Sequence, residues 1–139
     1  MIASCFFAVW EAPQNALGFL FLVLNRINGA VVDCSRERRR MFIRLRNGAV
    51  SLGYFVFWSM ESNDIFYLDE NNKFHEYGHS IQSRIFGPLY LLIIGLPSVF
   101  RVLYARRYVK KYKTRWPGYY AGFPENWADR LGNVHSINA

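Results

Sequence analysis

The sequence has little of several residue types, and each shortage excludes a class of protein. It contains two cysteines in 139 residues, too few for a disulfide-stabilised scaffold, and their spacing is not that of a metal-binding motif. We expect Cys5 and Cys34 to be free thiols, with a bridge between them as the alternative. Charged residues make up only 19% of the chain against 52% hydrophobic residues, which excludes an intrinsically disordered protein. The length predicts one domain spanning residues 1–139.

Acidic residues are also scarce, and the positive charge is concentrated in blocks. The chain holds 17 Lys and Arg against 10 Asp and Glu, a net charge of +7. Residues 1–25 contain no Lys or Arg and residues 85–100 no charged residue, whereas residues 101–115 contain seven Lys or Arg. Apolar segments beside basic blocks are typical of proteins that contact anionic lipid headgroups. We therefore predict contact with a membrane surface or anionic lipid rather than with nucleic acid, and a solvated basic face is the alternative.

No apolar segment reaches the roughly 20 residues that a membrane-spanning helix needs. Residues 1–10 and 16–24 are apolar, but Glu11 and Pro13 separate them. Residues 1–28 therefore predict helical structure that lies in the membrane interface or docks on the core as a hairpin, with a buried core helix as the alternative.

A second apolar helix is predicted for residues 85–104, bent or broken at Gly95 and Pro97. Its uncharged part is short for a straight membrane span, so we expect a re-entrant or peripheral helix. A loose tail is predicted for residues 133–139.

Residues 29–58 predict a β-hairpin. Residues 40–46 alternate, and Asn47-Gly48 is the strongest short signal for a hairpin turn because both residues tolerate a positive φ. The second strand, at residues 50–58, is apolar on both faces and should be covered on both sides. Arginines crowd the first strand, which predicts that it forms an exposed edge of the sheet. One face of that strand is apolar, at Met41, Ile43 and Leu45.

Two further helices carry polar residues. The first is predicted at residues 73–86, capped by Asp69 or Asn71 and ended by the Gly-Pro pair at residues 87–88. The second is short, at residues 125–131, with a proline before it and a glycine after it.

The first of these helices contains the pattern H-E-x-x-H, with histidines at His75 and His79. Side chains at positions i and i+4 lie one turn apart on the same helix face, so both imidazoles can reach one Zn²⁺ ion. Glu76 lies beside that face, where a carboxylate can take a proton from water during hydrolysis. A chance match in a chain of this size is expected about 0.01 times. The pattern therefore indicates a zinc site, and histidines that merely pack or cap are the alternative.

A third ligand is needed, because catalytic zinc usually has three protein ligands and a water molecule. The extended pattern with a third histidine is absent, since residues 82 and 85 are Gln and Ile. Glu125 and Asp129 lie one turn apart on the short helix. We predict that Glu125 binds the metal and that Asp129 accepts a hydrogen bond from a ligand histidine.

The motifs H-E-Y-G-H at residues 75–79 and E-N-W-A-D at residues 125–129 resemble those of the gluzincin zinc peptidases. The similarity is greatest to the membrane-associated group that includes the CAAX prenyl endopeptidases and the heat-shock membrane proteases. The chain is much shorter than those enzymes, so a minigluzincin core is the better comparison. Residues 75–91 also resemble small bacterial membrane-associated proteins without an assigned activity. This likeness implies a bacterial protein at the inner membrane. If any segment crosses that membrane, the basic segments should lie on its cytoplasmic side.

The gluzincin resemblance implies a role for each motif residue. His75, His79 and Glu125 would bind the metal, Glu76 would be the general base, and Asp129 would support His75. In gluzincins a β-strand above the motif helix holds the substrate backbone in extended form. The candidates for that strand are Ser51, Leu52, Gly53 and Tyr54, and a plain sheet strand is the alternative. Candidates to stabilise an oxyanion, by position alone, are Tyr119, Tyr120 and His135.

The sequence thus predicts an α+β domain with a small zincin-like core. Its parts are a β-hairpin or short sheet, the HExxH helix, a short ExxAD helix and apolar helices that lean on the membrane. The predicted function is zinc-dependent hydrolysis of a peptide or protein substrate. The alternatives are an inactive membrane-associated zinc-binding protein, and a lipid or nucleic-acid binder whose histidine motif is accidental.

Overall fold

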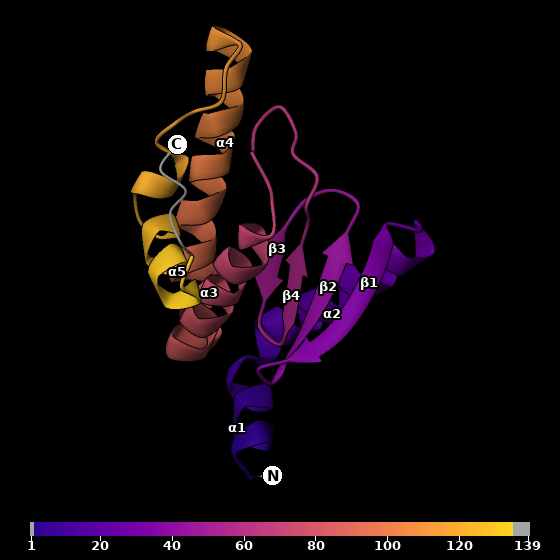
Figure 1. The fold of residues 1–139 in the computed structure, drawn as a ribbon. Helices are drawn as coiled ribbons and strands as arrows, with labels where there is room; N and C mark the ends of the chain where they lie inside the picture. The colour runs from indigo at the N-terminus through magenta and orange to yellow at the C-terminus, as the bar shows by residue number, and fades with distance from the viewer. Residues whose placement is uncertain (1, 135–139) are drawn as a thin grey trace.

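Helices cover both faces of a four-stranded β-sheet (Figure 1). The computed structural model describes residues 2–134, so His135 and most of the predicted C-terminal tail lie outside the described residues. The strands are β1 (Val31–Glu37), β2 (Arg40–Leu45), β3 (Val50–Leu52) and β4 (Phe55–Trp58). The α-helices are α1 (Ile2–Trp10), α2 (Ala12–Ile27), α3 (Asn71–Phe86), α4 (Leu96–Tyr112) and α5 (Glu125–Gly132). The predicted α+β class is confirmed.

Three short segments complete the fold. The 3₁₀ turns are η1 (Gly87–Leu89) and η3 (Tyr119–Ala121), and η2 (Leu91–Gly95) is a π-helical segment. Cys5 and Cys34 are both free, as predicted, and both are exposed.

The sheet does not have the predicted topology. Its strand order is β1-β2-β4-β3, in which β2 and β4 are parallel and the two outer pairs are antiparallel. The second hairpin turns at Gly53-Tyr54, where Gly53 has a φ of 63°, and not at Asn47-Gly48. Asn15 of α2 fixes this turn, because its side-chain oxygen accepts the Tyr54 N–H at 2.7 Å. The continuous alternation of residues 50–58 therefore conceals a chain reversal that depends on a distant residue.

The arginine-rich strand β2 is an inner strand, so the predicted exposed edge is wrong. Arg40 is buried, because its guanidinium pairs with the equally buried Glu11 at 3.0 and 3.1 Å. The same guanidinium donates to the Ser80 carbonyl of α3 at 2.7 Å. Buried charges are tolerated when they are paired and hydrogen-bonded, which explains why this strand need not lie at an edge.

The two faces of the sheet pack against different helices. On one face, Leu22 of α2 joins the core, and its partners in the sheet are Ile43, Leu45 and Phe57, with Met41 at the margin. On the other face, the ring of Tyr77 in α3 lies 6.0 Å from that of Phe42. The apolar face predicted for the first strand is thus confirmed, and it faces α2 (Figure 1).

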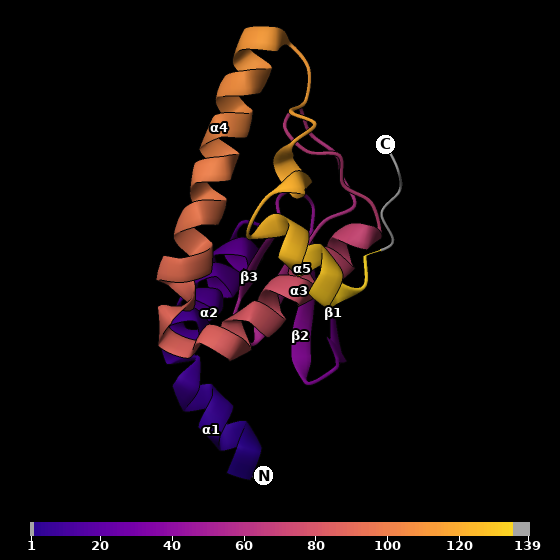
Figure 2. The same cartoon turned by 90° about the vertical axis from the view of Figure 1, so that its left-hand side faces the viewer.

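The N-terminal segment forms two helices, and α2 docks on the sheet. Its inner side buries Gln14, Gly18 and Leu22, whereas apolar side chains on its outer side remain exposed, among them Leu17, Phe19 and Leu20. In both views α1 extends beyond the sheet at the end of the molecule where β1 turns into β2 (Figures 1 and 2). Within residues 2–134, every helix falls short of the length or the apolar content that a bilayer-spanning helix needs.

The predicted helix at residues 73–86 is confirmed as α3, which begins two residues earlier. The predicted cap at Asp69 or Asn71 is wrong, because the N-cap is Glu70 and its side chain makes no capping bond. The Asp69 carboxylate instead accepts the Asn71 N–H at 2.8 Å in the turn before the helix. The apolar helix predicted next is divided instead into η1, η2 and α4. Pro97 does not bend α4, because it lies in the first helical turn, where no N–H donor is required.

Helices α3 and α5 approach each other unusually closely, at two glycines. A Cβ atom added to Gly78 would overlap the main-chain carbonyl of Ala128, and one added to Gly132 would overlap that of Phe74. The glycine in H-E-Y-G-H therefore serves the contact with the second motif helix. Neither overlap can be relieved by rotating a side chain, because the opposing atoms belong to the backbone.

We predict that Gly78→Ala lowers the free energy of unfolding by about 3 kcal/mol, the upper range for overpacking a core. The added methyl group pushes α5 away from α3. Chemical denaturation monitored by circular dichroism measures this loss. Gly95→Ala is the matched control, since its Cβ would meet no atom closer than 3.9 Å. Equal stability of the two variants would contradict the close packing of α3 and α5.

Candidate metal centre

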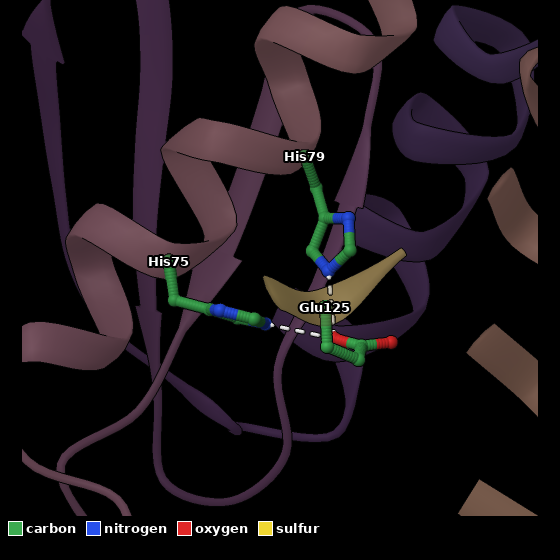
Figure 3. A group of neighbouring side chains, drawn as sticks. All are labelled: His75, His79 and Glu125. Carbon is green, nitrogen blue, oxygen red and sulfur yellow. Dashed lines mark hydrogen bonds and ion pairs between the residues drawn. The ribbon is translucent and has the colours of Figure 1, made fainter. Parts of the chain in front are cut away.

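Three predicted metal ligands meet between α3 and α5 (Figure 3). His75 and His79 point from successive turns of α3 toward Glu125, the first residue of α5. The Nε2 atoms of the two histidines each lie 3.0 Å from Glu125 Oε2. All three residues are buried, although Glu125 follows the histidines by 50 and 46 positions in the sequence.

The donor set fits a zinc ion. Zinc–nitrogen bonds of about 2.0–2.1 Å in a tetrahedral site place neighbouring ligand atoms roughly 3.3 Å apart. The two imidazole nitrogens and the carboxylate oxygen lie within 4.8 Å of one another, with two of the separations at 3.0 Å. Two imidazoles and one carboxylate are also a ligand combination found in catalytic zinc sites.

Hydrogen bonds at the site favour the charged forms of His75 and Glu125. Burial disfavours the imidazolium form of His75, but hydrogen bonds to Asp129 and Glu125 outweigh it and raise the pKa of His75 to about 10. Burial also opposes ionisation of Glu125, yet its bonds to the two histidines hold its pKa well below the usual range. A metal ion that bound here would therefore have to displace a proton from His75.

Each of the two clustered histidines is also held by a second partner. His75 Nδ1 donates to Asp129 Oδ1 at 2.6 Å, the pairing that the gluzincin resemblance implies. His79 Nδ1 donates to Gln82 Oε1 at 2.7 Å, and the Gln82 amide donates to the Pro124 carbonyl at 3.1 Å. Such bonds select the tautomer that leaves Nε2 free to bind metal.

Two of the supporting residues are missing from the sequence-based prediction. Gln82 lies three positions after His79, a spacing that places both on one helix face and could have indicated the contact. Ser98 of α4 donates to Glu125 Oε1 at 2.6 Å, so that the second carboxylate oxygen is also held. No local pattern indicates Ser98, because it reaches Glu125 only through the packing of α4.

Removal of the Gln82 amide should weaken zinc binding. We expect Gln82→Leu to lower the affinity about 10- to 100-fold, as loss of a partner behind a metal ligand usually does. Gln82→Glu keeps an oxygen that accepts the His79 N–H, so it should recover most of the affinity. Competition with a chromophoric chelator measures both variants. Wild-type affinity in Gln82→Leu would show that the amide does not position His79.

Glu76 is buried but is not one of the three clustered donors. Its Oε2 atom has no hydrogen-bond partner within residues 2–134. Burial raises the pKa of Glu76, although the neighbouring histidines oppose the shift. A buried carboxylate with a free oxygen and raised basicity is suited to accept a proton.

A cavity of about 740 Å³ lies beside the donors, and its walls are mainly apolar. His75, Glu76, His79 and Glu125 line one part of it, and the edge strand β3 lines another. The cavity therefore offers room for a substrate next to the donor atoms.

Two of the four residues predicted to hold a substrate strand line this cavity. Ser51 and Leu52 belong to β3 and line it, but the Leu52 side chain packs toward α2 and the Ser51 carbonyl already accepts the Tyr90 hydroxyl at 3.1 Å. Gly53 and Tyr54 form the β3–β4 turn against α2 instead. The close approach allowed by Gly53 is thus used for packing within the protein, because Asn15 occupies the space beside it.

Both predicted oxyanion tyrosines line the cavity as well. The Tyr120 ring lies edge-on to His75 with 5.1 Å between ring centres, whereas Tyr119 is buried against Phe66. Burial raises the pKa of both phenols, so they remain protonated hydrogen-bond donors. No placement is described for the third candidate, His135.

No protein-family model, curated protein or solved structure matches this chain. The likeness to gluzincins therefore stays a prediction from two short motifs. The interpretation of the site depends on its donor atoms, their burial and the cavity beside them.

Proposed function

We propose that this chain is a zinc-dependent metallopeptidase with a reduced zincin-like core formed by α3, α5 and the sheet. The observation that carries the proposal is the convergence of Glu125 on the two α3 histidines, next to Glu76, whose Oε2 has no hydrogen-bond partner among residues 2–134. A structural zinc site needs no free carboxylate, whereas hydrolysis needs a proton acceptor beside the metal.

The chemistry divides between the metal and the protein. His75, His79 and Glu125 would hold a zinc ion, which would supply the Lewis acidity that lowers the pKa of a water molecule. Glu76 accepts the proton that this water loses as its oxygen adds to the peptide carbonyl carbon. Glu76 then delivers that proton to the departing amine nitrogen as the C–N bond breaks. Tyr119 and Tyr120 are protonated donors in the same cavity and can stabilise the negative charge on the carbonyl oxygen.

The cavity suggests how a peptide would bind. Strand β3 is the outermost strand on its side of the sheet and borders the cavity, so an extended peptide could pair with its edge by displacing the Tyr90 hydroxyl from the Ser51 carbonyl. Largely apolar walls favour substrates with apolar side chains around the cleaved bond.

Metal removal tests the proposal directly. The purified protein should contain about one zinc per chain by elemental analysis, as three protein donors at one site imply. It should cleave a mixture of fluorogenic peptides with apolar residues, lose this activity in chelator and regain it with added zinc. Absence of zinc after gentle purification would overturn the proposal.

A non-catalytic zinc site is the second candidate, because the ligands join α3 to α5 and are fully buried. Zinc would then only hold the two helices together. In that case, zinc should raise the unfolding temperature and no peptide should be cleaved. Peptide cleavage that requires zinc would exclude a purely structural role.

A further inference from the structure

A second cavity, of about 680 Å³, lies apart from the metal centre and shares no lining residue with it. It is bordered by α1, by the β1–β2 turn and by the end of α3, and in Figure 2 α1 and this turn lie at the same end of the molecule. Five arginines line it: Arg36, Arg38, Arg39, Arg40 and Arg84. We call this cavity the arginine pocket.

The two acidic residues of the arginine pocket are already paired. Glu11 accepts two bonds from Arg40, at 3.0 and 3.1 Å, and a third from the Ser83 hydroxyl at 2.7 Å. Glu37 accepts a bond from Lys73 at 2.7 Å. Both carboxylates are thus neutralised by Arg40 and Lys73, which leaves the charge of the other four arginines uncompensated.

The remaining arginines lack acidic partners at bonding distance. Within residues 2–134, no carboxylate lies within 4.0 Å of Arg36, Arg38 or Arg39. Arg84 comes only to 3.9 Å from Glu11, and its buried Nε has no hydrogen-bond partner among those residues. Arg38 and Arg39 occupy adjacent turn positions, with φ of 48° and 60°. The Arg38 guanidinium lies over the rings of Tyr77 and Phe74 on α3, 5.0 and 5.8 Å from their centres. The guanidinium groups without a carboxylate or aromatic partner among the described residues of the pocket are therefore those of Arg36 and Arg39.

Apolar side chains border the arginine pocket on the α1 side. Phe7 lines it, and the Arg84 guanidinium lies 4.3 Å from the centre of the Phe7 ring. Two neighbours on the same helix are exposed, Phe6 by 59% and Val9 by 78%. Guanidinium groups beside exposed apolar side chains match the phosphate and the acyl region of a phospholipid.

We propose that the arginine pocket binds the phosphate group of an anionic phospholipid, with the exposed side of α1 inserted among the neighbouring acyl chains. Arginine suits this role, because its planar donors can bind two phosphate oxygens at once. The site goes beyond the proposed peptidase function and does not depend on it. It would place the chain on a membrane surface with α1 and the β1–β2 turn toward the lipid.

Vesicle flotation of the full chain tests the proposal. Wild type should float with vesicles of phosphatidylcholine mixed with phosphatidylglycerol, and only weakly with phosphatidylcholine alone. Arg36→Gln combined with Arg39→Gln should lower vesicle binding about 30-fold. Each basic residue near an anionic surface strengthens binding about fivefold, and the two losses multiply. Both residues are exposed and have no described side-chain contact, so the fold should persist.

A charge-matched control separates the pocket from general basicity. Arg107→Gln combined with Lys110→Gln removes the same charge from exposed positions near the far end of α4 (Figure 2). This pair should change binding by less than about threefold, because salt screens charges that are distant from the lipid. Val9→Ser should lower binding roughly tenfold through its lost apolar contact.

Three outcomes would overturn the proposal. Equal losses in the two double variants would mean that binding reflects diffuse charge alone. Binding of soluble glycerol phosphate that is lost in the Arg36/Arg39 variant, without vesicle binding, would assign the pocket to a soluble phosphate. Binding of single-stranded nucleic acid with that same dependence, again without vesicle binding, would assign it to nucleic acid.

Discussion

Glu76→Gln should retain zinc but lower peptide turnover by about 10²- to 10⁴-fold, the usual contribution of a general base. Glutamine has nearly the shape of glutamate, and Glu76 is not among the three clustered donors, so metal binding should not change. The amide cannot accept the proton that the attacking water must lose. Single-turnover cleavage of a fluorogenic peptide, with zinc content measured on the same sample, checks both halves of the prediction.

A glutamate on the same helix provides the control for this experiment. Glu70 is exposed at the start of α3, and Glu70→Gln should leave both zinc content and turnover unchanged. If Glu76→Gln cleaves peptides at the wild-type rate, Glu76 is not the general base, even if zinc remains essential. Loss of zinc in Glu76→Gln would instead assign Glu76 a structural role at the site.

Glu125→Ala should lower zinc affinity more than about 100-fold, beyond the loss expected for a residue that only supports a ligand. Its Oε2 atom contacts both histidine Nε2 atoms, so this one substitution removes a ligand and the contact between α5 and the α3 imidazoles. The metal-free protein should also be less stable, because the imidazolium of His75 loses one of its two carboxylate partners.

Chelator competition and thermal unfolding measure these two effects of Glu125→Ala. Glu61→Ala removes an exposed carboxylate whose side chain has no described contact, and it should behave as wild type. Unchanged zinc affinity in Glu125→Ala would remove Glu125 from the ligand set. The metal would then need a different third donor.

The two motif helices are predictable because their signals are local. The spacing of His75 and His79, and the turn between Glu125 and Asp129, are properties of any helix at those positions. One helix carries two histidines, and the other carries a third possible metal ligand and a carboxylate that can support a histidine. This match is enough to predict that the two helices meet. The sequence does not indicate how closely the two helices pack. Gly78 has no side chain, so the backbone of the second helix can lie directly against it.

The sheet is predictable only in part, because its order depends on contacts distant in sequence. The alternation in β2 correctly identifies its apolar face. The pairing of β2 with β4, by contrast, requires the chain to reverse at Gly53 against Asn15 of α2. Local rules also place an arginine-rich strand at an edge, and they fail here because Glu11 compensates Arg40 inside the protein.

The polar network around Arg40 has a consequence for the metal centre. Arg40 of β2 donates to the Ser80 carbonyl, and Gln14 of α2 donates to the Ser83 hydroxyl, so α2 and β2 both hold the side of α3 away from α5. The orientation of α3 is therefore set by contacts that do not involve the histidine donors. We therefore expect a zinc ion to meet a preorganised site, with little of its binding free energy consumed in ordering the chain. On this expectation the chain should fold without the metal, unlike small zinc modules that fold only when the metal binds.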